Sequence, residues 1–171
     1  MKRIGIISDT HSYIDDPIIE FFSDCDEIWH AGDIGDRLVT DILAKIKPLR
    51  AVYGNIDTQE LRREYPENQL FELEGVKVFI THIGGYPGRY TARVKNILLK
   101  ENVDLYICGH SHILKVIHDP LFDLLHINPG AAGITGIHTI RTAIRFTIGG
   151  KEKMSDLQVV EFGDKIQKRS R

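Results

Sequence analysis

Residues 3–11 read RIGIISDTH, a short apolar stretch that stops abruptly at an aspartate and a histidine. Its length and its isoleucine content favour a buried strand over a helix. The next stretches repeat this plan: residues 16–22 and 37–46 predict helices, and residues 27–30 and 49–53 predict strands that each stop at a polar cluster. The first third of the chain therefore reads β-α-β-α-β, which predicts a parallel sheet with right-handed crossovers.

The rest of the chain is richer in strands. Residues 71–74 and 76–82 predict a hairpin that turns at Gly75, and residues 91–100 predict a helix. The remaining expected elements are strands at 105–108, 114–119, 124–127, 139–148 and 154–162, a loop at 128–136, and a solvated basic tail at 165–171. No repeat or linker divides the sequence, so we expect one domain over residues 1–171.

Composition restricts the class of protein. The 171 residues are 42% hydrophobic and 27% charged, which fits a folded globular chain and excludes a low-complexity one. A formal net charge of -2 gives no reason to expect generic nucleic-acid binding. No apolar run reaches the ~18–20 residues of a membrane helix, and Cys25 and Cys108 cannot build a disulfide framework. We therefore expect a cytoplasmic protein without membrane association.

Side chains that bind metals follow several of the predicted strands. Asp9 and His11 follow the first strand, Asp33 follows the second and Asn55 the third. Because sites form at the carboxyl ends of parallel strands, we expect these residues to meet. The Asp-x-His spacing also points both side chains the same way if the backbone is extended.

Three histidines, His82, His110 and His112, bring the set of candidate ligands to seven. Mixed nitrogen and oxygen ligands suit Mn, Fe, Zn or Ni better than Ca or Mg. Seven ligands are too many for one catalytic ion with an open position, but they suit two ions that share a carboxylate. Such sites place their ions roughly 3.5–4 Å apart.

The order of the motifs resembles the signature of the calcineurin-like metallophosphoesterase superfamily: Asp9-x-His11, Gly32-Asp33, Gly54-Asn55-x-Asp57, His82 and Gly109-His110-x-His112. The resemblance covers residues 1–148, and its length and motif variant resemble the small single-domain phosphodiesterases of bacteria and archaea. Residues 128–130, Asn-Pro-Gly, resemble a late loop of those proteins. The resemblance implies an α/β fold, a four-layer α-β-β-α sandwich of two mixed sheets.

The resemblance also implies an enzyme, a dinuclear metal-dependent phosphodiesterase in which a hydroxide shared by two ions attacks phosphorus in line. One ion would take Asp9, His11 and His112, the other would take Asn55, His82 and His110, and Asp33 would bridge both. The residues expected to act in catalysis are Asp33, Asn55, His82 and Asp57. The expected cofactors are two divalent ions, with Mn preferred over Ni, Fe or Zn.

The Gly-Asn-x-Asp motif leaves two questions open. Asp57 fits a helix N-cap and a hydrogen-bond partner of the ligands equally well. Many members of the superfamily carry a histidine between the Asn and the Asp, and it can protonate the leaving group. This chain has Ile56 there, which puts the hydrolysis of esters with poor leaving groups in doubt.

Residues outside the motifs receive structural interpretations. His30 is expected to be buried and hydrogen-bonded, and His118, His126 and His138 are interpreted as structural or surface residues. A surface role is favoured over a contact with substrate phosphate for three further residues: Tyr86, Arg89 and Arg141.

Two other functions compete with the phosphodiesterase. One is a non-catalytic interaction module, because the superfamily includes a retromer coat subunit of similar size. A complete ligand set argues against that function, since unused buried carboxylates and imidazoles reduce stability. The other is a small-molecule phosphomonoesterase. We expect a small phosphoester as substrate, and the sequence is compatible with a homo-oligomer.

Overall fold

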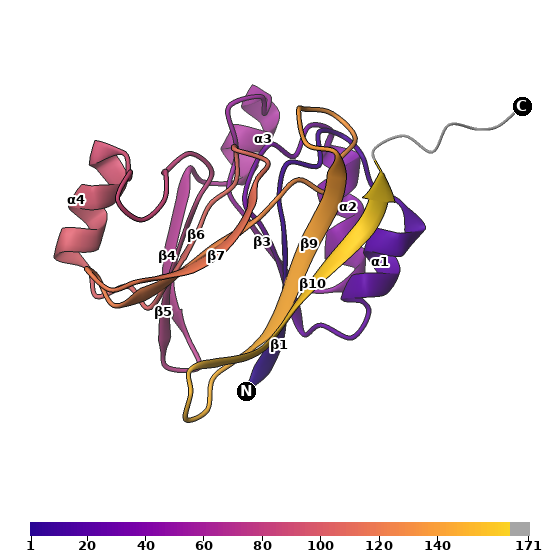
Figure 1. The fold of residues 1–171 in the computed structure, drawn as a ribbon. Coiled ribbons are helices and arrows are strands. Elements are labelled where there is room, and N and C mark those ends of the chain that lie inside the picture. The colour runs from indigo at the N-terminus through magenta and orange to yellow at the C-terminus, as the bar shows by residue number, and fades with distance from the viewer. Residues whose placement is uncertain (165–171) are drawn as a thin grey trace, which may run out of the picture.

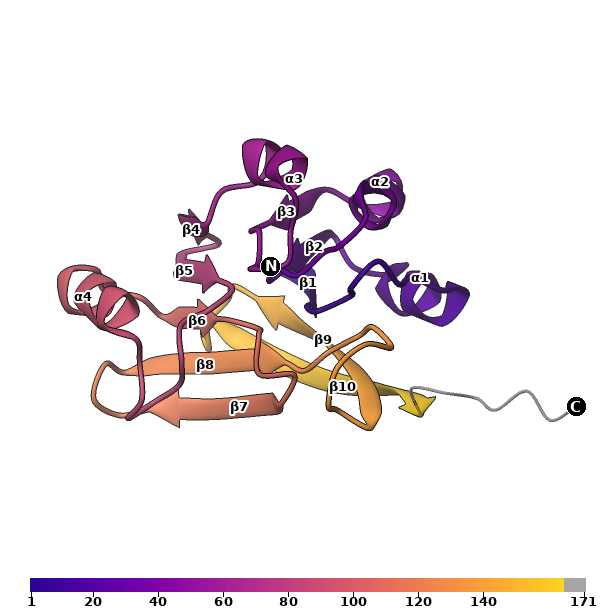
Figure 2. The ribbon, with the colours of Figure 1, turned by 90° about the horizontal axis from the view of Figure 1, so that it is seen from above.

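The computed structural model describes residues 1–164, and the predicted basic tail lies outside the described residues. Two five-stranded sheets stack face to face, in the orders β10-β9-β1-β2-β3 and β4-β5-β6-β8-β7. Helices α1, α2 and α3 lie on the outer side of the first sheet, and α4 lies beside the second (Figures 1 and 2). The predicted four-layer α-β-β-α sandwich is confirmed.

The first sheet joins both ends of the described chain, and its strands are β1 (Lys2–Ile7), β2 (Glu27–His30), β3 (Leu49–Ala51), β9 (Ile140–Ile148) and β10 (Met154–Asp164). The pairs β1·β2 and β2·β3 are parallel, as the β-α-β-α-β pattern predicts. β9 pairs antiparallel with β1, so the late strands extend the sheet on its other side.

The second sheet is built from the middle of the chain, and its strands are β4 (Asn68–Leu73), β5 (Val76–Thr81), β6 (Leu105–Ile107), β7 (Leu114–Asp119) and β8 (Leu124–Pro129). The predicted hairpin between β4 and β5 is confirmed, with Glu74 and Gly75 at positive φ in its turn. The predicted loop at 128–136 is wrong at its start. Asn128 and Pro129 are the last residues of β8 and pair with β7.

The helices are α1 (Asp16–Phe22), α2 (Arg37–Ile46), α3 (Gln59–Glu64) and α4 (Ala92–Lys100). The side chains of Asp15, Asp36 and Thr91 cap the N-termini of α1, α2 and α4 by accepting backbone hydrogen bonds. The sequence did not predict α3, because Leu61 is its only buried residue and no apolar periodicity marks it. In residues 1–164, no helix combines the length and the apolar character that a membrane crossing requires.

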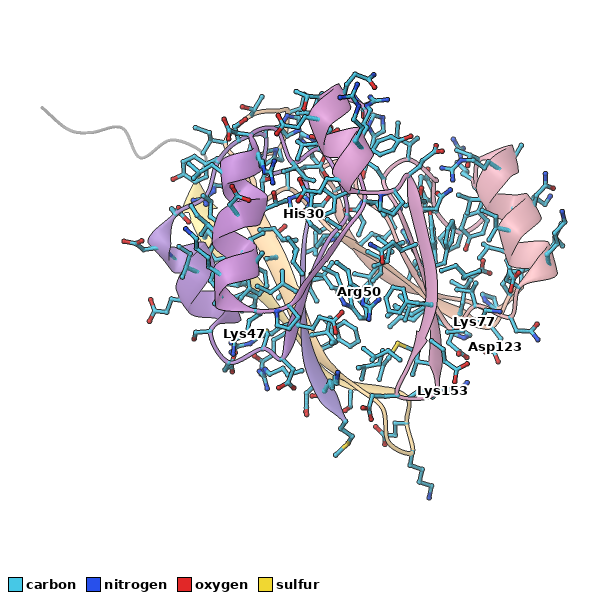
Figure 3. All side chains as sticks on the ribbon, turned by 180° about the vertical axis from the view of Figure 1, so that it is seen from behind. His30, Lys47, Arg50, Lys77, Asp123 and Lys153 are labelled. Atoms are coloured by element: carbon cyan, nitrogen blue, oxygen red, sulfur yellow. The ribbon has the colours of Figure 1, made fainter. Side chains whose placement is uncertain are left out.

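Apolar side chains fill the space between the layers. Ile6, Trp29, Val78 and Ile127 belong to the cluster between the two sheets, and each is fully buried. At one edge of this space, Arg50 of β3 pairs with buried Glu27 and lies 4.2 Å from the centroid of the Phe71 ring on β4 (Figure 3). The two sheets therefore share one core, which fixes their loop ends relative to each other.

The importance of this core can be tested with two isoleucines on neighbouring strands. Ile127 of β8 is fully buried, whereas Ile117 of β7 is 44% exposed. Ile127→Ala should lower the free energy of unfolding by about 2–5 kcal/mol, because it leaves a cavity between the sheets. Ile117→Ala should change it by no more than about 0.5 kcal/mol. Urea denaturation of both metal-free variants measures the difference, and equal losses would contradict the shared core.

Candidate metal centre

Six of the seven predicted ligands lie together at the loop ends of the two sheets. The first group comes from the loops after β1 and β6, and the second from the loops after β2, β5 and β6. Within each group the possible ligand atoms lie within 4.8 Å of one another: Asp9, His11 and His112 in the first, and Asp33, His82 and His110 in the second.

The two groups are adjacent. Asp9 Oδ1 lies 3.1 Å from His112 Nε2, and Asp33 Oδ2 lies 3.2 Å from His82 Nε2. Across the groups, Asp33 Oδ2 is 3.6 Å from His11 Nε2. Asp33 therefore faces histidines of both groups, which is the position that a shared carboxylate requires.

Several of the buried atoms at this centre have no hydrogen-bond partner among the described residues: Asp9 Oδ1, His11 Nε2 and His82 Nε2. A buried polar atom without a partner is costly, and native proteins rarely leave one so. Divalent cations held by the two groups would satisfy these atoms, because Asp9 and His11 belong to the first group and His82 belongs to the second. The residues present therefore fit a metal centre.

The second polar atom of Asp9 and of His82 forms hydrogen bonds within the protein. Asp9 Oδ2 accepts hydrogen bonds from Ser8 Oγ at 2.6 Å and from the backbone N–H of His110 at 3.0 Å. His82 Nδ1 lies 2.7 Å from the carbonyl oxygen of Ala31. Donation to that carbonyl places the proton on Nδ1 and leaves Nε2 free as a ligand, an arrangement typical of metal-binding histidines.

The backbone at the ligands is strained. Asp9, His11, Asp33, His110 and His112 all have φ between 45° and 69°, a region that few non-glycine residues adopt. Residues keep such a strained backbone only where the surrounding structure enforces it, and they are concentrated at functional sites. The extended backbone predicted for the Asp-x-His spacing is thus wrong. The side chains meet because of left-handed turns instead.

Two motif glycines allow the loops to approach the ligands closely. A Cβ atom at Gly54 would lie 2.1 Å from Asp33 Oδ1, and one at Gly109 would lie 2.0 Å from Ser8 Oγ. Any larger residue would therefore displace Asp33 or the hydroxyl that orients Asp9. This close approach gives a physical reason for the glycine in the Gly-Asn and Gly-His pairs.

Asn55 and Asp57 lie in the loop after β3 and play different parts. Asn55 is exposed beside Asp33, and its ligand role stays a prediction. Asp57 is buried and caps no helix, since the N-cap of α3 is Thr58. Its carboxylate accepts backbone hydrogen bonds from Gly54 at 2.7 Å and Gly35 at 2.8 Å. Asp57 thus ties the loop that carries Asn55 to the loop that carries Asp33.

The sequence analysis missed two residues that support the centre. His138 Nδ1 lies 3.1 Å from His112 Nδ1, and His138 Nε2 lies 2.9 Å from the carbonyl of Gly133, so His138 orients His112. Arg62 donates hydrogen bonds to the carbonyls of Asp57 and Asn55. His138 carries no local signal, because it is 26 residues from the histidine it contacts. Arg62 belongs to none of the motifs, although its partners Asp57 and Asn55 do.

The other histidines and Arg141 have structural environments. His30 is fully buried, lies near the loop end of the sheet (Figure 3), and contacts the Thr10 hydroxyl at 2.9 Å, so its prediction is confirmed. His118 contacts Asp123 at the surface. Arg141 is not at the surface: it is buried, pairs with Asp15 at 2.9 Å and is unavailable to a substrate.

Charge compensation shifts the pKa values at the centre. Burial would raise the pKa of Asp9, but its contacts with His11 and His112 lower that pKa well below the usual range. Contact with Asp9 raises the pKa of His11 despite burial. Burial lowers the pKa of His82, but contacts with Asp33 and Asp9 outweigh it and raise that pKa. The metal-free centre therefore holds protons that a bound cation must displace.

Comparison with known proteins identifies the family. Residues 1–151 match the Calcineurin-like phosphoesterase superfamily domain, and the chain belongs to this family. It is 33% identical over 133 residues to a protein of Methanothermobacter thermautotrophicus named "Probable metallophosphoesterase", covering 75% of this chain and 76% of that one. A protein of Methanocaldococcus jannaschii with the same description is 31% identical, over 75% of this chain and 67% of its own.

Solved structures share the fold. An archaeal protein described as a novel phosphodiesterase superposes with a TM-score of 0.71 at 24% identity, over 94% of this chain and 99% of its own. Vps29 from Chaetomium thermophilum superposes with a TM-score of 0.73 at 17% identity, over 94% and 95% of the two chains. These likenesses establish the architecture, and the family match and the sequence relatives place the chain in the metallophosphoesterase family.

Metal affinity should depend on pH through the histidines. Contacts with Asp9 and Asp33 raise the pKa values of His11 and His82 in the metal-free protein, so both imidazoles hold their protons more firmly than a free histidine does. A cation must displace these protons, so the Kd for Mn²⁺ should fall as pH rises from 6.5 to about 8. Titration calorimetry in buffers of different ionisation enthalpy should detect proton release. A Kd that does not change over this range would contradict the assignment of these histidines.

Proposed function

We propose that this chain is a metal-dependent phosphodiesterase with a dinuclear centre. The observation that carries the proposal is the convergence of three buried ligand atoms without partners in the described chain: Asp9 Oδ1, His11 Nε2 and His82 Nε2. These atoms come from two adjacent groups of ligands, Asp9 and His11 in the first and His82 in the second, so the donor set suits two ions. The family makes a phosphoester the expected substrate.

The proposed ligand roles follow the two groups. Asp9, His11 and His112 hold one ion, His82 and His110 hold the other together with Asn55, and Asp33 is shared. The pair would supply a water of lowered pKa as nucleophile and positive charge against the phosphoryl oxygens. The preferred metal is Mn²⁺, since carboxylate, amide and imidazole ligands suit it.

The protein contributes orientation. The backbone N–H of Ile56 donates to Asp33 Oδ1 at 3.0 Å, which leaves Oδ2 turned toward the histidines. Asp57 touches backbone amides rather than the open centre, so we assign it a positioning role. Burial of Asp9 and Asp33 excludes water from one side of the centre and strengthens their attraction for a cation.

At position 56, the loop after β3 offers no proton donor for the leaving group. Ile56 is 45% exposed in the loop beside Asp33 and has no proton to donate. General acid catalysis typically contributes about 10²–10⁴-fold when a leaving group needs a proton. The enzyme should therefore prefer esters whose leaving group departs without protonation.

Asp33→Asn tests the shared carboxylate. It should lower kcat/KM for bis(p-nitrophenyl) phosphate with Mn²⁺ by about 100-fold or more, and it should reduce the bound Mn²⁺ per chain at both positions. EDTA should inactivate the native enzyme, and added Mn²⁺ should restore it. Asp41→Asn, on the exposed face of α2, is the matched control and should behave like the native enzyme.

Each alternative function has its own outcome in this test. Metal binding without turnover of any phosphoester would support a non-catalytic interaction module. A higher kcat/KM for p-nitrophenyl phosphate than for the diester would support a phosphomonoesterase. Full turnover by Asp33→Asn with two bound ions would contradict the shared role of Asp33.

Ile56→His tests the missing acid. The substitution keeps the backbone N–H that orients Asp33 and adds a proton donor to the same loop. The gain in kcat/KM should be larger for a dialkyl phosphodiester, which must expel an alcohol, than for bis(p-nitrophenyl) phosphate, which expels nitrophenolate. Metal content must be measured in parallel, because the new imidazole is itself a ligand. Equal gains for both leaving groups would mean that the proton comes from elsewhere.

A further inference from the structure

A small cavity opens beside the second ligand group. Its volume is about 150 Å³, and it lies between the loop after β5, the loop after β6 and the strand β8. His110, one of the proposed ligands, is part of its wall. A molecule held at the metal centre can therefore extend into the cavity without leaving the protein surface.

The wall of the cavity is apolar and uncharged over most of its area. Ile83, Tyr86 and Ile113 contribute hydrophobic surface. Cys108 also lines the cavity, and its Sγ lies 3.5 Å from the carbonyl oxygen of Gly85. His126 is neutral at pH 7, because burial lowers its pKa to about 4. Lys115 also lines the cavity, but a charged group placed against the apolar part of the wall would lose its water without compensation.

The cavity is preformed by aromatic packing behind it. The His126 ring stacks on Tyr106 with centroids 4.9 Å apart, and Tyr106 stacks on Phe79 at 5.7 Å. The Tyr106 hydroxyl donates to the carbonyl of Gly85 at 3.1 Å, which fixes the loop after β5 against this stack. A ligand therefore does not have to order the wall before it binds.

The volume of the cavity matches one aromatic ring. An apolar cavity of about 150 Å³ is large enough to hold benzene. Lys115 Nζ lies 3.7 Å from the centroid of the Tyr86 ring, and both residues line the cavity. Ser111 and Asn128 add a few polar groups to the otherwise mostly apolar wall.

We propose that this cavity binds an aromatic ring carried as one ester arm of the phosphoester held at the metal centre. The proposal rests on the proposed function and narrows its substrate to aryl phosphodiesters. The absence of an acid at Ile56 favours the same class. A phenol with a pKa of about 10 departs without a donated proton far more readily than an alcohol does.

Binding of two phosphonates tests the proposal without turnover. The Mn²⁺-loaded protein should bind phenylphosphonate about 10- to 100-fold more tightly than methylphosphonate, because only the phenyl ring enters the cavity. Titration calorimetry gives both values of Kd. Equal affinities would overturn the aryl pocket and leave the metal-centred function intact. Failure of both phosphonates to bind would overturn the proposed function as well.

Two variants and a control locate the effect. Ile113→Trp should block the cavity and reduce the preference for phenylphosphonate to within about twofold, while methylphosphonate binding stays at the native level. Leu38→Trp on α2 is the matched control, since Leu38 and Ile113 are both 59% exposed. Tyr86→Ala removes a wall and should also weaken the preference. If both Ile113→Trp and Tyr86→Ala keep the native preference for phenylphosphonate over methylphosphonate, the phenyl ring does not bind in this cavity and the proposal is overturned.

Discussion

Two buried carboxylates, Asp9 and Asp33, face a set of histidines across the seam between the two sheets. Each carboxylate would be strongly destabilising alone, so its charge must be met by imidazolium protons or by a cation. Both sheets must supply partners, because Asp9 and Asp33 follow strands of the first sheet while His82, His110 and His112 follow strands of the second. The shared core therefore fixes the positions of the two carboxylates relative to the histidines that face them.

This constraint explains the strain and the tight loops around the centre. The left-handed turns at the ligands cost stability, and the glycines beside them leave no room for a side chain. The loops are then fixed from behind, by Asp57 and Arg62 on one side and by His138 on the other. Among the described residues, Asp9 Oδ1, His11 Nε2 and His82 Nε2 are left without a hydrogen-bond partner, and bound cations would recover that cost.

The sequence predicted the strands and the ligands better than their geometry. Apolar runs followed by Asp, Asn or His marked β1, β2 and β3, because each of these buried strands leads directly into a loop that carries a candidate ligand. The stacking of two sheets followed from family resemblance, since pairing between distant strands leaves no local pattern. α3 was missed because it buries only Leu61, and the C-terminal end of β8 was misjudged because Asn128 and Pro129 are loop-type residues. His138 and the cavity near His126 depend on tertiary packing alone.

The central claim is that the two ligand groups hold two neighbouring ions with Asp33 between them. Anomalous X-ray scattering from crystals of the Mn²⁺-loaded protein measures this directly. The account predicts two manganese peaks roughly 3.5–4 Å apart, both within coordination distance of the Asp33 carboxylate. A single peak, or two peaks of which only one touches Asp33, would contradict it.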